Sequence, residues 1–188
     1  MKFTKLAVTF ASLLIAGSAM AAGGYTSLEY YDETNRATDA TNIKEALVVG
    51  MKDGDTDYSL KMENSQTEFG NGSISQGMEV RVKQSFGDKG GIRPYVGIRL
   101  GEKVTSSTHF SHYAVDAGVK IPLGAGFTGD IGGRYRDAFD TSNDYTTQRA
   151  HLAIGYELTK QDAIAVRWSR SWGDEEKDAV RLQYTRSF

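Results

Sequence analysis

Asp178-Ala179-Val180-Arg181-Leu182-Gln183-Tyr184-Thr185-Arg186-Ser187-Phe188, the last eleven residues, decide the fold. An extended chain would place Val180, Leu182, Tyr184 and Phe188 on one side and mostly polar residues on the other. The same alternation recurs upstream, and its polar side is rich in arginine and lysine. A transmembrane β-barrel turns its apolar side to lipid and its charges to the lumen, whereas a soluble core does the reverse. The pattern therefore favours a barrel that crosses a membrane.

The closing segment resembles the last strand of Gram-negative outer-membrane β-barrel proteins, which ends in phenylalanine preceded by apolar residues at alternate positions. Arg186 departs from that pattern, although an arginine at the membrane rim can reach the lipid headgroups. The resemblance covers the whole mature chain in style, that of a small porin-like or OmpX-like protein, and does not single out one family. It implies that Phe188 is the signal read by the barrel-assembly machinery. It also implies export through the periplasm to the bacterial outer membrane, in contact with its lipid and lipopolysaccharide.

The N-terminal segment predicts a cleaved secretory signal. A basic head with Lys2 and Lys5 is followed by the apolar run Leu6–Ala16 and by Ala19-Met20-Ala21, an A-x-A cleavage site. The apolar run is too short to span a bilayer. We expect residues 1–21 to be removed and residues 22–188 to form one barrel domain. Its net charge is then −4 rather than −2, because two lysines leave with the signal.

Composition narrows the possibilities further. The chain has no cysteine, which excludes disulfides, thiolate nucleophiles and cysteine-ligated metals. Beyond the signal, no run approaches the roughly 18 apolar residues that a membrane helix needs. A membrane-spanning mature chain must therefore be a closed barrel. A soluble sandwich with reversed faces is the alternative, but it would bury about a dozen lysines and arginines at a prohibitive cost.

Turn and loop signals divide the mature chain into alternating segments. We expect an all-β, antiparallel up-and-down barrel of ten strands, with eight or twelve as alternatives. Four tight turns and five longer polar loops should alternate, as periplasmic turns and external loops do. Aromatic residues should form two girdles, with Tyr58, Phe86, Phe127, Tyr156 and Phe188 at the turn ends and Tyr30, Tyr113, Tyr135 and Trp168 toward the loops. The expected strands are residues 25–31, 43–51, 56–66, 76–86, 92–100, 110–123, 127–136, 149–158, 164–169 and 180–188.

The inward face of these strands is predominantly basic. Its expected acids are Glu29, Glu63, Glu79, Asp116, Asp130 and Glu157. One interpretation is that the charges pair and plug a narrow barrel, because barrels of about eight strands are just filled by side chains. The other is that surplus cations line a narrow path that favours anions. The expected lumen bases are Lys44, Lys61, Arg81, Lys83, Arg93, Arg99, Lys120, Arg134, Arg136, Arg149, Arg167 and Arg181.

The expected outer loops carry the opposite charge. Their bases are Arg36, Lys103 and Lys177. A solvated surface explains such acidic loops, and divalent-cation binding near lipopolysaccharide is a sharper hypothesis, because clustered carboxylates are hard oxygen ligands. The acids are Asp32, Glu33, Asp39, Asp137, Asp140, Asp144, Asp174, Glu175, Glu176 and Asp178.

Catalytic patterns are weak. Residue 153 is alanine, so His151 lacks the His-x-Ser spacing of deacylase-like barrels, and it is better placed as a hydrogen-bonding residue of the lumen. Ser111 and His112 are adjacent in a strand and should point to opposite faces, which prevents a direct hydrogen bond between them. We expect no enzyme activity, no cofactor, no metal centre and no nucleic-acid partner.

These observations lead to two hypotheses of different classes. The first is a narrow passive diffusion channel that favours small anionic solutes. Its lining residues would be Arg81, Lys83, Arg93, Arg99, Lys120, Arg134, Arg136, Arg149, Arg167 and Arg181. The second is a non-conducting structural or surface-interaction barrel. Planar-bilayer conductance separates the two.

Overall fold

A computed structural model describes residues 23–67, 74–105, 109–140 and 145–188, so the predicted signal at residues 1–21 lies outside the described chain. Among the described residues, no helix has the length and apolar character needed to cross a membrane. The ten strands are β1 (Gly24–Asn35), β2 (Thr41–Asp53), β3 (Thr56–Thr67), β4 (Ile74–Ser85), β5 (Arg93–Thr105), β6 (His109–Gly124), β7 (Phe127–Ala138), β8 (Thr147–Glu157), β9 (Asp162–Gly173) and β10 (Lys177–Ser187).

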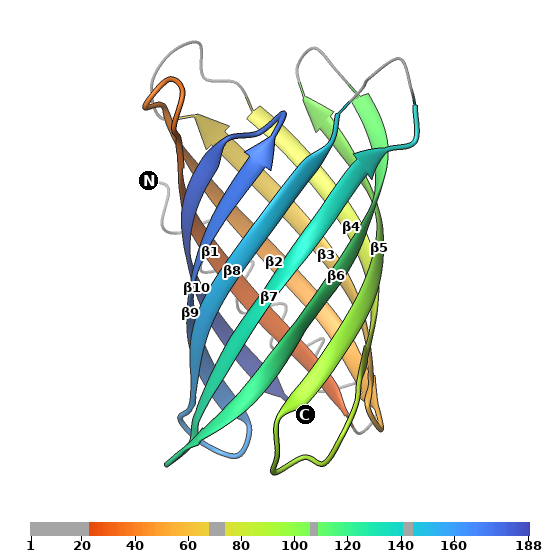
Figure 1. The fold of residues 1–188 in the computed structure, drawn as a ribbon, viewed down its shortest axis with the longest axis vertical. Coiled ribbons are helices and arrows are strands. Elements are labelled where there is room, and N and C mark those ends of the chain that lie inside the picture. Colours follow the sequence, from red (N-terminus) through yellow and green to blue (C-terminus); the bar gives the residue numbers. More distant parts are fainter. Residues whose placement is uncertain (1–22, 68–73, 106–108, 141–144) are drawn as a thin grey trace.

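The strands form one closed antiparallel barrel. Each strand pairs with its neighbours in sequence, and β10 pairs with β1 to close the sheet. The closing register sets Tyr25 opposite Ser187 and Asn35 opposite Lys177. Figure 1 shows the tilted strands around a common axis, with the C-terminus at the end that carries the connections β2–β3, β4–β5, β6–β7 and β8–β9. The expectation of a ten-stranded up-and-down barrel is confirmed.

The two faces of the sheet have the polarity that the sequence predicts. In β4, Val80 and Val82 are exposed on the outside, 50% and 48%, while Arg81 and Lys83, which alternate with them, line the interior. Ile98, Ile154 and Leu182 are likewise exposed outward. Aromatic side chains point outward at both ends of the barrel, among them Tyr30, Tyr58, Phe86, Phe127, Tyr135, Tyr156, Trp168 and Trp172. Such an apolar outer face is suited to contact with the hydrocarbon region of a membrane rather than with water.

Several strands are longer than their apolar stretches indicate. The segment Asp32–Asn35, expected as the start of a loop, continues β1. β9 and β10 are separated only by Asp174–Glu176, which is shorter than expected for a loop, whereas Phe86–Ile92 joins β4 to β5 at the opposite end. The prediction that short turns and longer loops alternate strictly along the chain is therefore wrong. The reason is that ladder hydrogen bonds satisfy the backbone beyond the apolar belt, so pairing does not stop where hydrophobicity does.

Glycines allow large lumen side chains to lie flat against the wall. A Cβ atom built on Gly118 would come within 2.5 Å of the Tyr95 hydroxyl, and one on Gly132 within 2.6 Å of it. Tyr25 covers Gly50 in the same way, with its ring carbon 2.3 Å from the ideal Cβ position. The absence of a side chain at these positions lets the aromatic rings fill the wall without narrowing the centre of the lumen.

Candidate functional site in the lumen

Two adjacent cavities occupy the lumen. The one in the loop half of the barrel has a volume of about 100 Å³, and the one at the short-turn end has about 390 Å³. Their walls share Lys61, Glu79, Arg99, Arg134 and Arg167, so the two cavities are neighbours inside the barrel. Of the basic residues singled out from the sequence, Lys120 lines only the larger cavity. Those lining the smaller cavity are Lys44, Lys61, Arg81, Lys83, Arg99, Arg134, Arg136, Arg149, Arg167 and Arg181.

Arg93 is placed differently from expectation. It is the first residue of β5 and contributes to neither cavity wall. Its guanidinium pairs with Asp55 in the β2–β3 connection, at the rim of the short-turn end. The alternation correctly predicted that Arg93 lies on the inward face of the sheet. Because β5 begins at this residue, the Arg93 side chain stays at the short-turn rim and does not reach the cavities.

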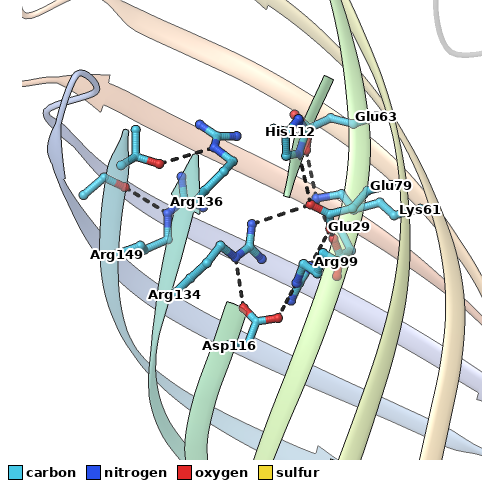
Figure 2. A network of polar contacts seen from close by, with 12 residues as sticks. Glu29, Lys61, Glu63, Glu79, Arg99, His112, Asp116, Arg134, Arg136 and Arg149 are labelled. Atoms are coloured by element: carbon cyan, nitrogen blue, oxygen red, sulfur yellow. Dashed lines mark hydrogen bonds and ion pairs between the residues drawn. The ribbon is translucent and has the colours of Figure 1, made fainter. Parts of the chain in front are cut away.

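Two buried carboxylates and two arginines form a compact cluster in the middle of the lumen. Arg99 donates to Glu79 at 2.6 Å and also to Asp116. Arg134 donates to Asp116 at 3.0 Å and approaches Glu79 at 4.0 Å. Figure 2 shows the two guanidinium groups converging on Asp116 from β5 and β7. Each charge therefore has an oppositely charged partner, as buried charges require.

A second chain of ion pairs runs from the centre toward the loop end. Glu29 pairs with Arg181 at 2.7 Å and with Lys61 at 3.4 Å, and Lys61 continues to Glu63 at 2.8 Å. Lys44 then links Glu63, at 3.5 Å, to Glu33, at 2.9 Å. These residues come from strands on both sides of the closing seam. The chain of ion pairs therefore ties the first strands to the last one through the lumen.

The β9–β10 connection closes this chain of ion pairs at the loop end. Glu175 turns inward and pairs with Lys177 at 3.1 Å, Arg136 at 3.2 Å and Lys103 at 3.5 Å. Burial alone would raise the pKa of Glu175, but these three cations hold that pKa well below its usual range. Burial also raises the pKa of Tyr145, which accepts a hydrogen bond from Arg136 at 2.8 Å. The β9–β10 connection therefore places a charged carboxylate, that of Glu175, at the loop end of the lumen.

Several acids were misplaced by the sequence interpretation. Glu33 and Glu175 were assigned to the outer loops, yet both side chains line or enter the lumen, and that of Glu33 is only 1% exposed. Lys103 and Lys177 belong to the same network rather than to the loops. Extending the β1 alternation from Glu29 would have identified Glu33, whereas Glu175 carries no such signal because it lies in a connection. Glu157, assigned to the interior, lies exposed at the short-turn mouth.

The histidines make polar contacts of different kinds. His151 Nε2 lies 3.2 Å from Asp130 and 3.3 Å from the Tyr95 hydroxyl, so its hydrogen-bonding role in the lumen is confirmed. His112 is buried while Ser111 is exposed, which confirms that they face opposite sides of β6. His112 approaches Glu79 at 3.6 Å. His109 contacts Glu102 on the outer face.

The acidic loops contain little that resembles a cation site. Asp178 pairs with Arg170 at 2.7 Å, and Glu176 lies 3.9 Å from Arg36. In the part of the chain that the structure describes, no three His, Asp or Glu side chains gather as a metal site would need. Asp144, one of the expected loop acids, lies outside the described residues.

The fold is a closed up-and-down β-barrel that resembles the barrels of bacterial outer-membrane proteins. An outer-membrane channel from Pseudomonas putida F1 is similar in structure, with a TM-score of 0.60 and 8% sequence identity over 90% of this chain and 97% of that one. The NanC porin gives 0.56 and 9% identity, over 86% and 100% of the two chains. The translocator domain of the autotransporter NalP from Neisseria meningitidis gives 0.55 and 11%, over 100% and 98%. No family model and no curated protein sequence matches the chain.

Proposed function

We propose that this protein is an outer-membrane barrel that forms a narrow passive channel favouring small anions. The observation that carries the proposal is the charge of the lumen wall. Even with Glu33, Asp57 and Glu175 included, bases outnumber acids along the two cavities and the mouth above them. Rings of arginine and lysine favour anions by charge, and the effect is strong in a confined path.

The same network sets the expected size of the current. Ion pairs cross the loop half of the lumen, where the cavity measures only about 100 Å³. The passage should therefore admit inorganic ions and small solutes and exclude larger ones. The wall that limits it is polar and charged, so water can accompany an ion through it.

A second candidate function is supported by a specific observation. Every carboxylate of the central cluster and of the ion-pair chain has at least one cationic partner within 3.5 Å. Such pairing is also what a non-conducting structural barrel needs to fill its lumen. In that case the charges would serve the stability of the barrel, and the outer surface would carry its interactions with lipid or other cells.

Our proposal includes the partners that the closing strand implies. Phe188 is the proposed signal for the barrel-assembly machinery, and the outer surface the proposed contact with outer-membrane lipid and lipopolysaccharide. Phe188 donates its backbone N–H to Gly24 at 2.9 Å, at the seam where the barrel closes. No catalytic role is proposed.

Planar-bilayer recording in a KCl gradient tests the channel. We expect a small current whose reversal potential favours chloride. Replacing both central arginines, Arg99→Ser with Arg134→Ser, should shift the reversal potential toward potassium, because Glu79 and Asp116 lose their nearest cations. Arg170→Ser is the matched control, because its guanidinium pairs with Asp178 on the outer face and not in the lumen.

The outcomes separate the two candidates. No current from correctly folded protein would eliminate the channel and leave the structural barrel. Current with the same selectivity in the double variant would contradict the assignment of the path to the lumen wall.

A further inference from the structure

The larger cavity at the short-turn end has an uneven distribution of charge. Four bases, Lys52, Arg81, Lys83 and Lys120, line it from β2, β4 and β6. Strands β8 to β10, on the other side of the ring, contribute two arginines, Arg167 and Arg181, which are paired with Asp130 and Glu29. They also contribute small or hydroxyl side chains, including Ala153, Ala165, Thr185 and Ser187. The strand bases with only distant acid partners therefore lie on one side of a space of about 390 Å³, whereas the arginines on the other side are closely paired.

The four bases lie close enough to influence one another. The electrostatic neighbours of Lys120 include Lys52 and Arg81, and those of Lys83 include Lys120 and Arg81, while Asp57 and Asp130 act on both lysines with the opposite sign. The ammonium of Lys52 lies 5.5 Å from the centre of the Tyr25 ring, and that of Lys83 lies 5.4 Å from the centre of the Tyr95 ring. The lysines are thus held against aromatic walls of the cavity.

One carboxylate, Asp57, neutralises this group only in part. It accepts a hydrogen bond from the Tyr25 hydroxyl at 2.7 Å and lies 3.4 Å from Arg81 and 3.6 Å from Lys83. Asp130, the other nearby acid, is held at 3.0 Å by Arg167 and at 3.2 Å by His151. Among the described residues, no carboxylate lies within 4.0 Å of the ammonium of Lys120 or Lys52.

This distribution contrasts with the rest of the lumen. In the central cluster and in the chain toward the loops, acids and bases alternate, and each acid is in direct contact with a base. In the short-turn cavity, Arg81 and Lys83 share Asp57 at 3.4 and 3.6 Å. Arg81 Nε is buried without a hydrogen-bond partner among the described residues, as are the Nε atoms of Arg167 and Arg181. Clustered like charges raise one another's electrostatic free energy, and an anion bound between them lowers it.

We propose that the short-turn cavity is a binding site for a compact anion with at least two negative charges, of the phosphate-ester or pyrophosphate class. Arg81 offers a guanidinium fork suited to two phosphate oxygens, while Lys83 and Lys120 supply point charges around it. The volume falls within the range of small-molecule sites. Short turns face the periplasm in outer-membrane barrels, so the site takes its ligand from that side. Its orientation rests on the proposed membrane location, but binding does not need an open channel.

Isothermal titration of the folded full-length mature protein with inorganic pyrophosphate tests the site. The detergent is an amine oxide, so that no lipid phosphate competes for the cavity. We expect binding with a Kd below about 1 mM at low salt, weakened by added KCl because the contacts are ionic. Lys83→Gln with Lys120→Gln should weaken binding at least tenfold. Lys89→Gln, in the exposed β4–β5 connection at the same end of the barrel, should change it less than twofold.

Each outcome decides the proposal. Absence of binding by the wild-type protein overturns it, as does equal weakening by Lys89→Gln, which would indicate nonspecific attraction by the mouth. Gel-shift electrophoresis with and without heating establishes that each variant is folded. If the double variant does not fold, Lys120→Gln alone decides, with an expected weakening of threefold or more, because the Lys120 ammonium makes no ion pair with any residue that the structure describes.

A bilayer experiment separates this site from the channel function. Pyrophosphate added at the short-turn side should reduce the chloride current, and Lys83→Gln with Lys120→Gln should relieve the block. If calorimetry detects binding and the bilayer carries no current, the site stands and the channel proposal falls. If current flows but calorimetry detects no binding, the site falls and the channel stands.

Discussion

Gly118 illustrates how a single residue shapes the lumen wall. A Cβ atom there would lie 2.5 Å from the carbonyl oxygen of Ile131 and 2.5 Å from the Tyr95 hydroxyl. The first contact is with backbone, which cannot move aside as a flexible side-chain end can. The position therefore requires glycine because of a close approach.

We expect Gly118→Ala to lower the free energy of unfolding by about 1–3 kcal/mol, through a steric clash in a packed wall. Gly90→Ala is the control, since an ideal Cβ at Gly90 has no neighbour within 4 Å. Urea unfolding of both variants in lipid vesicles, followed by tryptophan fluorescence, measures the difference. Equal stabilities would mean that Tyr95 and the backbone at Ile131 relax without cost.

At the scale of the element, the β9–β10 connection is held by Glu175. The low pKa of this carboxyl means that its charged form is favoured in the folded protein. Its contribution to stability is therefore present above its unfolded pKa and is lost only as pH falls through the depressed folded pKa. The connection should stay anchored from neutral pH down to the mildly acidic range.

We expect Glu175→Gln to lower the free energy of unfolding at pH 7 by about 1–3 kcal/mol, because Lys103, Arg136 and Lys177 lose their shared anion. Glu176→Gln is the neighbouring control. Its carboxylate is 55% exposed and lies 3.9 Å from Arg36, a surface pair worth little. Unfolding measured from pH 7 to pH 4 should show the effect of Glu175→Gln across this range. An effect that vanishes at pH 5 would contradict the depressed pKa.

β10 gives a second prediction at this scale. Removing Phe188 deletes the backbone N–H donated to Gly24 and the terminal aromatic side chain. We expect the amount of folded protein in the outer membrane to fall severalfold, because the proposed assembly signal and the end of the seam are both lost. The measurement is the heat-dependent mobility of membrane fractions. Ser187→Ala leaves the backbone unchanged and should assemble normally.

At the scale of the whole molecule, the inversion of polarity determines where the protein can reside. Both tryptophans of the chain, Trp168 and Trp172, point outward and are 44% and 41% exposed. We expect phospholipids brominated on the acyl chains to quench Trp168 fluorescence strongly in reconstituted vesicles, with Trp168→Phe and Trp172→Phe separating the two signals. Aqueous iodide should quench Trp168 weakly. The opposite order of quenching would contradict a lipid-facing surface.

The sequence predicts the barrel well because the deciding signal is local. Alternation in β4 or β10 can be read from adjacent residues, and it assigns Val80 and Arg81 to opposite faces without knowledge of their neighbours. Polar strand ends such as Asp32–Asn35 escaped detection, because their pairing depends on the adjacent strands rather than on hydrophobicity.

The charge pattern of the lumen was only partly predictable. The face occupied by Arg99 and Arg134 follows from alternation, but their convergence on Glu79 and Asp116 depends on the stagger of four strands. The inward turn of Glu175 depends on the loop that carries it. The uneven charge of the short-turn cavity likewise emerges only when β2, β4 and β6 are placed opposite β8 to β10.

The seam between β1 and β10 has a consequence for biogenesis. It pairs Tyr25 with Ser187, residues at nearly opposite ends of the mature chain. The first strand therefore has an unsatisfied hydrogen-bonding edge until the last strand has been synthesised and has paired with it. An exposed edge invites pairing with another copy, and long-range closure is slow. We therefore expect the chain to be most prone to self-association in the interval before this seam closes.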